Sequence, residues 1–150
     1  LLRVADALGA DKVYCSGKTP QLPNPMIPVT SMGAHRRVEM VWHKVHEDAA
    51  KAALAEGWTL VAVEIAEGAE AYFDFAYPPK TCLVLGAEGA GVFGSVLKHC
   101  VGSVFIPMQG KGRSMNVHVS GAVVAFHVKA DSWRQSAQEM SGTTDPLDSL

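Results

Sequence analysis

The chain has 150 residues, of which 48% are apolar and 19% charged, and its formal net charge is −2. This length and composition are typical of one globular domain with a sizeable core, and they argue against a low-complexity chain. The slight negative charge argues against a histone-like or arm-type nucleic-acid binder. It remains compatible with an RNA enzyme whose positive patch is local.

No stretch reaches the roughly 18 uninterrupted apolar residues that a membrane span requires. The N-terminal sequence LLRVADALGADK lacks the basic region and the small-residue cleavage site of a signal peptide. Cys15, Cys82 and Cys100 lie far apart and form no CxxC pair, a pattern typical of reduced thiols in a cytosolic protein. We therefore expect a cytoplasmic protein that has no membrane span and no disulfide framework.

Hydrophobic periodicity predicts strands that alternate with helices. In chain order we expect a helix at 1–8, a strand at 12–15, a proline-rich surface loop at 16–28, a strand at 38–42, a helix at 46–55, strands at 58–65 and 81–85, a helix at 92–99, a strand at 103–107 and a helix at 116–134. The last helix is apolar nearly all round and should be buried, and 136–150 should form a flexible polar tail. Continuously apolar strands between helices predict an α/β fold with a mostly parallel sheet and helices on both faces.

The glycine-rich turn at 86–91 directly follows the predicted strand 81–85. Its glycines, at 86, 89 and 91, permit positive φ and close approach of a ligand to the backbone, and the following helix start offers free N–H groups. Such a turn alone is a weak signal, because tight strand-to-helix connections use glycine for purely structural reasons. Glu88 strengthens the case, because a carboxylate in a ligand-facing turn is costly without a partner.

A second polar loop, QGKGRSMN at 109–116, follows the predicted strand 103–107. Ser114 or Asn116 is suited to cap the final helix. Capping does not explain the nearby Lys111 and Arg113, which on a glycine-hinged loop beside a ligand turn suit a phosphate backbone. We therefore expect RNA contacts from these two cations.

Other candidate side chains have ordinary explanations. His43 and His46 are spaced as metal ligands can be, but no further ligands cluster near them, so we predict no metal site. His118 and His127 lie on the final helix and are expected to be hydrogen-bonded core residues. Arg3 by itself is typical of a surface arginine that packs its stem on apolar neighbours.

The glycine turn and the second loop together resemble two motifs of the SpoU (TrmH) branch of the SPOUT RNA methyltransferases. The second family motif is matched by LVLGAEGAGVFGSVL and the third by IPMQGKGRSMNVHVSGAVV, in the family order and at the family spacing. The first motif is represented by its second half, LLRVADALGADKVY, with Arg3 at the family arginine; the family asparagine would fall before Leu1. The NVHVSGA form resembles a eukaryotic tRNA ribose methyltransferase subgroup. The resemblance covers residues 1 to about 130, and a methyltransferase domain is expected at 1–135.

This resemblance implies an α/β fold whose C-terminal part forms a deep trefoil knot, an exception to the rule that chains avoid knots. It also implies S-adenosylmethionine as the cofactor, held largely by backbone groups of three loops. The residues expected to bind it are Val63, Glu64, Leu85, Gly86, Gly91, Ile106, Met108, Ser114 and Met115.

The reaction that the resemblance implies is methylation of a ribose 2′-hydroxyl in RNA, with tRNA favoured over rRNA. Glu88 and Asn116 would shape the site and orient the ribose, and Arg3 would assist deprotonation of the hydroxyl. Because an arginine is a poor base at its usual pKa, it would rather stabilise the developing alkoxide. Family members are homodimers, and Phe126 and Trp133 on the final helix are candidates for the dimer interface.

Two other classes of protein remain open from the sequence. The first is a catalytically impaired RNA-binding module that kept the fold. The second is a nucleotide-dependent oxidoreductase with a Rossmann turn, although the glycine turn follows a late strand rather than the first one.

Overall fold

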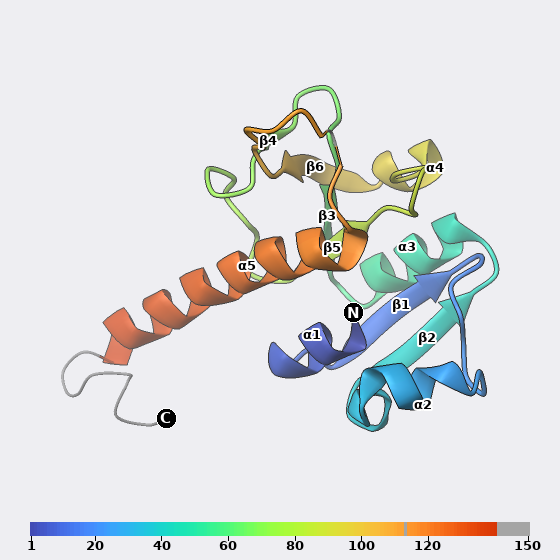
Figure 1. The fold of residues 1–150 in the computed structure, drawn as a ribbon. Helices are drawn as coiled ribbons and strands as arrows, with labels where there is room; N and C mark the ends of the chain where they lie inside the picture. Colours follow the sequence, from blue (N-terminus) through green and yellow to red (C-terminus); the bar gives the residue numbers. More distant parts are fainter. Residues whose placement is uncertain (113, 141–150) are drawn as a thin grey trace.

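The computed structural model describes residues 1–112 and 114–140. Figure 1 shows two groups of strands with helices around them. The strands are β1 Lys12–Ser16, β2 Glu39–His43, β3 Thr59–Val63, β4 Glu70–Ala71, β5 Thr81–Leu85 and β6 Cys100–Phe105. The helices are α1 Leu2–Ala7, α2 Met26–Ser31, α3 His46–Ala55, α4 Gly94–Leu97 and α5 Val117–Met140, with a 3-10 turn, η1, at Ala34–Arg36.

Within residues 1–112 and 114–140 the pairs between named strands are parallel, in agreement with the predicted mostly parallel sheet. Hydrogen bonds divide the strands into a pair, β1–β2, and a sheet of four in the order β4-β6-β3-β5. Parallel strands place all their carboxyl ends at one edge, where α/β proteins bind ligands. The α/β class with a parallel sheet is confirmed, and the trefoil knot stays a prediction.

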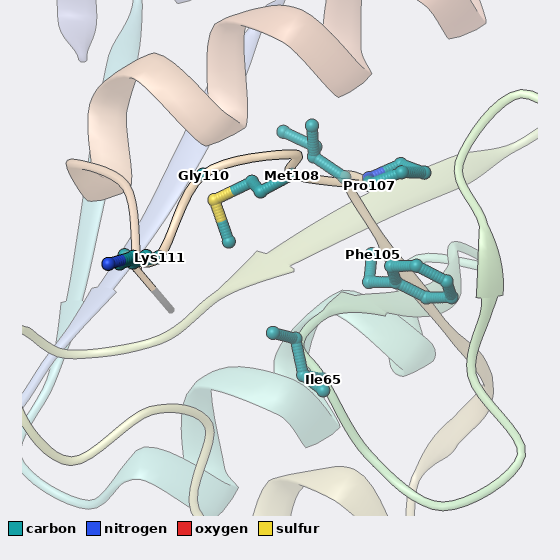
Figure 2. Close-up of a pocket in the computed structure, with 8 residues that line it drawn as sticks. Ile65, Phe105, Pro107, Met108, Gly110 and Lys111 are labelled. Atoms are coloured by element: carbon teal, nitrogen blue, oxygen red, sulfur yellow. The ribbon is translucent and has the colours of Figure 1, made fainter.

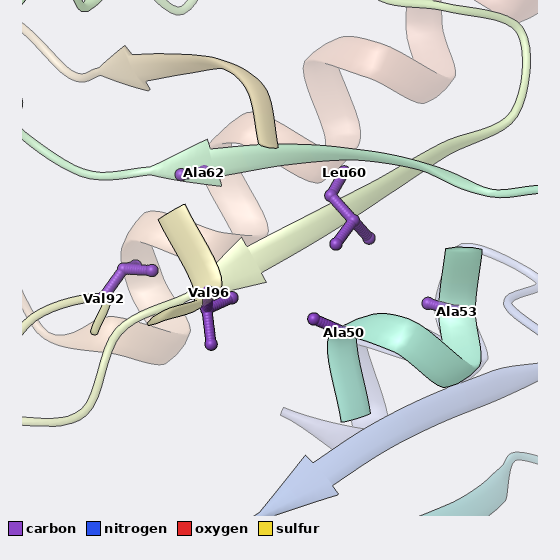
Figure 3. Close-up of a cluster of buried hydrophobic side chains, with 6 residues drawn as sticks. All are labelled: Ala50, Ala53, Leu60, Ala62, Val92 and Val96. Carbon is purple, nitrogen blue, oxygen red and sulfur yellow. The ribbon is translucent and has the colours of Figure 1, made fainter. Parts of the chain in front are cut away.

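The central strand β3 is covered on both faces. Leu60 and Ala62 pack against Ala50 and Ala53 of α3 and against Val96 of α4, as Figure 3 shows. Successive residues of a strand point to opposite faces of the sheet. On the other face, Val61 and Val104 pack against Val124 of α5. Helices on both faces are therefore confirmed.

Several elements differ from the sequence predictions. Strand β6 lies at Cys100–Phe105 rather than at 103–107. The proline-rich segment contains a helix, α2, because Pro28 falls in its first turn, where the missing N–H needs no partner. Helix α4 is shorter than 92–99, because Phe93 is extended at its N-cap. The two-residue strand β4 is too short to leave a periodic pattern.

The prediction that α5 is buried was wrong. Val124 is buried, but Val119, Phe126 and Trp133 are 40%, 41% and 52% exposed. In Figure 1 the second half of α5 projects away from the sheets. The helix also continues to Met140, past the predicted end at 134, and the rest of the predicted tail, 141–150, lies outside the described residues. Among residues 1–112 and 114–140, no helix is long and apolar enough to cross a membrane.

The cysteines are free thiols, as predicted. Burial raises the pKa of Cys82 and of Cys100 to about 11. Both thiols are therefore protonated at neutral pH, which makes them inert components of the core.

A charge cluster around Glu47 joins α3 to the end of α4. The Glu47 carboxylate accepts a hydrogen bond from His99 Nε2 at 2.9 Å. It also forms an ion pair with Lys98 Nζ at 2.9 Å. Lys51, one turn along α3, lies 3.4 Å away. The hydrogen bonds from His99 and Lys98 lower the pKa of Glu47 to about 2.

We expect this cluster to make folding sensitive to acid. Because the folded-state pKa of Glu47 lies below its unfolded value of 4.5, its contribution is fully present above that value. It is lost as the pH falls from there toward about 2. Glu47→Gln should therefore flatten the fall in unfolding free energy between the unfolded pKa of 4.5 and the folded pKa of about 2, measured by urea denaturation. An equal fall in both proteins would show that other carboxylates set the acid sensitivity.

Candidate active site

The carboxyl ends of three neighbouring strands meet at one edge of the larger sheet. Val63 at the end of β3 is paired with Leu85 of β5 and with Val104 of β6. The loops that begin at Glu64, Gly86 and Ile106 consequently leave the sheet side by side. The structure thus brings together three segments that the sequence analysis assigned to the cofactor.

The glycine turn after β5 is closed by its own backbone. The Ala87 N–H donates to the Gly91 carbonyl at 3.0 Å, and the Gly91 N–H donates to the Ala87 carbonyl at 2.9 Å. A Cβ on Gly86 would lie 2.5 Å from the Gly91 carbonyl carbon and 2.9 Å from Val92 N. Glycine at 86 is therefore a requirement of the turn itself, since backbone atoms have little room to move.

The side chain of Glu64 braces this turn. One carboxylate oxygen accepts a hydrogen bond from the Val92 N–H at 2.8 Å, and the other accepts one from the Ile65 N–H at 2.9 Å. Gly91 adopts φ +67°, and a Cβ there would overlap Glu64 Oε2. The family resemblance implied only a cofactor contact for Glu64. The hydrogen bond from the Val92 N–H leaves no local sequence signal, because the two residues are 28 positions apart.

A pocket of about 490 Å³ opens between the end of β3 and the loop after β6. Its lining is mostly apolar and includes Ile65, Phe105, Pro107 and Met108. Figure 2 shows Met108 reaching into the space from the loop, with Ile65 on the opposite side. The volume lies within the range of small-molecule sites, and the pocket is open to solvent on one side.

The rim of this pocket carries a cation, Lys111, which lies among its lining residues. Lys111 is exposed, so its ammonium group is available to a negatively charged ligand. Arg113, its predicted partner in RNA contact, lies outside the described residues.

The end of the same loop joins α5. Asn116 is exposed and caps the helix: its Oδ1 accepts a hydrogen bond from the His118 N–H at 3.1 Å. Ser114 and Met115, also predicted to bind the cofactor, are exposed on the same segment. The capping role that the sequence suggested for Ser114 or Asn116 therefore belongs to Asn116.

The other two predicted catalytic residues are exposed. Glu88 lies at the tip of the glycine turn. Arg3 lies on α1, whose N-terminal neighbour Leu1 approaches α5 near Gly121. The structure thus places the start of α1 beside the second turn of α5. Among the described residues, no hydrogen bond or ion pair joins Arg3 to the pocket lining. In the described part of the chain, no group of three or more His, Cys, Asp or Glu side chains could hold a metal ion.

A parallel α/β fold with a glycine turn, a brace and an apolar pocket at the carboxyl edge defines a class of protein that binds a small cofactor there. The sequence model of the SpoU rRNA Methylase family matches residues 1–126. The chain belongs to this family, as the resemblance of its motifs predicts.

The relatives of the chain include enzymes named for tRNA and for rRNA. It is 30% identical over 129 residues to the tRNA (guanosine(18)-2′-O)-methyltransferase of Thermus thermophilus, covering 86% of this chain and 66% of that protein. It is 28% identical to the 23S rRNA (guanosine(2553)-2′-O)-methyltransferase RlmP of Bacillus subtilis, covering 86% of this chain and 51% of that protein. The chain thus spans from half to about two thirds of the length of these relatives.

Solved structures share the fold. The TrmH/SpoU tRNA modifying enzyme of A. aeolicus superposes with a TM-score of 0.77 at 21% identity, covering 90% of this chain and 68% of that one. The SpoU methyltransferase AviRb of Streptomyces viridochromogenes, in complex with the cofactor AdoMet, superposes with a TM-score of 0.77 at 26% identity. That match covers 89% of this chain and 54% of AviRb.

Proposed function

We propose that this chain is the catalytic domain of an S-adenosylmethionine-dependent methyltransferase that modifies ribose 2′-hydroxyl groups in RNA. The observation that carries the proposal is the meeting of three cofactor loops at the carboxyl edge of β3, β5 and β6 in a chain of the SpoU family. The AdoMet complex of AviRb, a protein of the same fold, supports the choice of cofactor.

The residues present fit this cofactor. Gly86 and Gly91 let the turn fold compactly, because a Cβ at Gly86 would meet the Gly91 and Val92 backbone and one at Gly91 would meet the Glu64 carboxylate. The pocket beside Met108 suits an adenosine-like group. When bound, S-adenosylmethionine supplies an electrophilic methyl group. Backbone groups of Val63, Leu85 and Ile106 would hold it, together with the loop that carries Ser114 and Met115.

On the RNA side, the chain's polar residues have separate tasks. The Asn116 amide and the Glu88 carboxylate would orient the ribose, and the Arg3 guanidinium would stabilise the alkoxide that forms on loss of the 2′-hydroxyl proton. Lys111 at the pocket rim would contact a phosphate, with Arg113 beside it in sequence. The names of the relatives at 30% identity favour tRNA over rRNA as the substrate, and the predicted cytoplasmic location is consistent with either.

The direct test of this function is calorimetric titration with S-adenosylhomocysteine, with NAD and NADH as controls. We expect micromolar binding of S-adenosylhomocysteine alone, together with a rise in melting temperature, because a ligand that binds only the folded state stabilises it. Binding of NAD or NADH instead would identify an oxidoreductase. No binding of any of the three would contradict the proposed cofactor site.

We further propose that the chain is a homodimer through α5. Val119, Phe126 and Trp133 are exposed and are seven residues apart, so they form one stripe that drifts only about 20° per repeat along the helix. Large exposed apolar side chains in one stripe are typical of a protein interface. A dimer would also combine the cations of two slightly acidic chains at one RNA surface.

The dimer can be tested by placing a charge in this stripe. Phe126→Glu should convert a dimer to a monomer, measured by light scattering after gel filtration, since an unpaired buried carboxylate is costly. Leu54→Glu is the matched control, because Leu54 is 37% exposed on α3, outside the stripe, and should leave the mass unchanged. A monomeric wild-type chain would contradict the interface.

A further inference from the structure

A second group of ligand-competent side chains lies at the carboxyl ends of β1 and β2. Ser16 and His43 are the paired last residues of these two strands. Directly beyond them, His46 begins α3 and its ring lies against Phe93 at the N-cap of α4. None of these four residues belongs to the cofactor pocket described above.

The imidazole of His46 is held rigidly in this group. The ring stacks on Phe93 with centroids 4.4 Å apart and planes inclined by 16°. A Cβ on Gly17 would lie against the ring, so the Gly17 backbone also packs closely on it. Ser16 Oγ lies 2.9 Å from His46 Nδ1 and fixes the ring's rotation. The result is a pre-organised aromatic pair, and 40% of Phe93 remains exposed although His46 covers one of its faces.

This aromatic pair lies next to the candidate active site. Phe93 follows Gly91 and Val92, and the Val92 N–H is the group that Glu64 binds. The contact between His46 and Phe93 therefore joins the carboxyl ends of β1 and β2 to the glycine turn of the larger sheet. An RNA whose ribose is oriented by Glu88 in the glycine turn, as proposed above, would pass close to Phe93, which lies two residues after Gly91.

The loops at this edge also carry positive charge. Lys18 and Lys44 are exposed and follow the ends of β1 and β2 by two residues and one residue, respectively. Asp48 is an exposed acid on the first turn of α3. The neighbouring Glu47 is already paired with Lys98 and His99. A pre-organised aromatic surface flanked by lysines is what single-stranded nucleic acids bind, through stacked bases and neutralised phosphates.

We propose that Phe93, supported by His46, stacks an unpaired base of the RNA next to the methylated nucleotide, and that Lys18 and Lys44 contact the flanking phosphates. This inference rests on the proposed function, of which it specifies the substrate: single-stranded or loop RNA rather than a continuous duplex, whose bases are not available for stacking.

The experiment measures RNA and cofactor binding separately on the full chain. Fluorescence anisotropy is recorded with a labelled single-stranded RNA dodecamer and with tRNA transcripts, and calorimetry with S-adenosylhomocysteine. We expect Phe93→Ala and His46→Ala to weaken RNA binding about 5- to 150-fold, the range for loss of one base–aromatic stack. Phe93→Trp should retain affinity, which would show that an aromatic ring at this position is what the RNA requires. The affinity for S-adenosylhomocysteine should change less than about twofold.

The lysines are tested through the salt dependence of binding. The double variant Lys18→Glu, Lys44→Glu should reduce the slope of log affinity against log salt by about 1.4, since each single-strand phosphate contact contributes about 0.7. Arg36→Glu is the matched control, because η1 precedes β2 at the opposite end of that strand. Val101→Ala is the apolar control, because Val101 is exposed near the amino end of β6.

The outcomes distinguish this inference from the proposed function. Wild-type RNA affinity in Phe93→Ala, or no RNA binding by a chain that binds S-adenosylhomocysteine, would overturn the inference and leave the cofactor assignment intact. A change in oligomeric state rather than in RNA affinity would show that a protein covers this edge instead. RNA binding that depends on Phe93 without any S-adenosylhomocysteine binding would support the inference and contradict the proposed enzyme.

Discussion

Gly86→Ala should abolish cofactor binding, with a loss of affinity for S-adenosylhomocysteine of about 100-fold or more, equivalent to about 2.8 kcal/mol. The reason is steric: the new methyl group would meet three backbone atoms of Gly91 and Val92 at 2.5–2.9 Å. The turn would have to open, which breaks the Ala87–Gly91 hydrogen bonds and moves the loop away from the edge of the sheet. Calorimetric titration of the variant measures this loss.

The matched control lies in the same turn. Gly89→Ala also introduces a methyl group, but nothing lies within 4 Å of it, and only the φ of +81° opposes the change. Both variants should lower the free energy of unfolding by a similar amount. Gly89→Ala should cost about 1–2 kcal/mol, because residue 89 is left-handed, and Gly86→Ala about 1–3 kcal/mol, because its methyl group is crowded. Only Gly86→Ala should lose the cofactor. If the two variants bind S-adenosylhomocysteine with equal affinity, the glycine turn does not belong to the cofactor site.

Asn116→Ala should have two effects of different origin. Loss of the hydrogen bond between Asn116 Oδ1 and the His118 N–H should cost about 1 kcal/mol of unfolding free energy, as for other N-caps. If Asn116 orients the ribose as proposed, loss of its amide should slow methyl transfer to tRNA transcripts about 10²- to 10³-fold, as removal of one positioned donor does in other enzymes. Urea denaturation and a labelled-methyl assay measure the two effects.

Asn116→Asp separates the two roles. Aspartate caps a helix as well as asparagine does, and its charge is favourable at a helix N-terminus, so stability should return to the wild-type value. The side chain no longer carries an NH₂ donor, so the rate should stay low. If the rate recovers together with stability, Asn116 acts only as the cap of α5 and has no part in the reaction.

Local sequence rules located most of the elements that build the site. Strand β5 lies at 81–85 and helix α3 at 46–55, both as predicted. The strand is a continuously apolar run with a glycine directly after it, and the helix ends where Gly57 adopts φ +84°. The same rules failed for two helices. Prolines predicted a loop where α2 forms, because Pro28 lies in its first turn, and the apolar composition of α5 predicted burial of a helix whose apolar face is exposed.

The sequence by itself determined the α/β class, the parallel strands and the family, because these depend on short-range periodicity and on motifs in which all the residues are close together in the chain. Only the tertiary structure decided how Glu64 is used and where His46 lies, since each of these side chains meets a partner from a distant segment, Val92 and Phe93 respectively. Their positions follow from strand register and loop path, and these are set by burial of the whole sheet rather than by neighbouring residues.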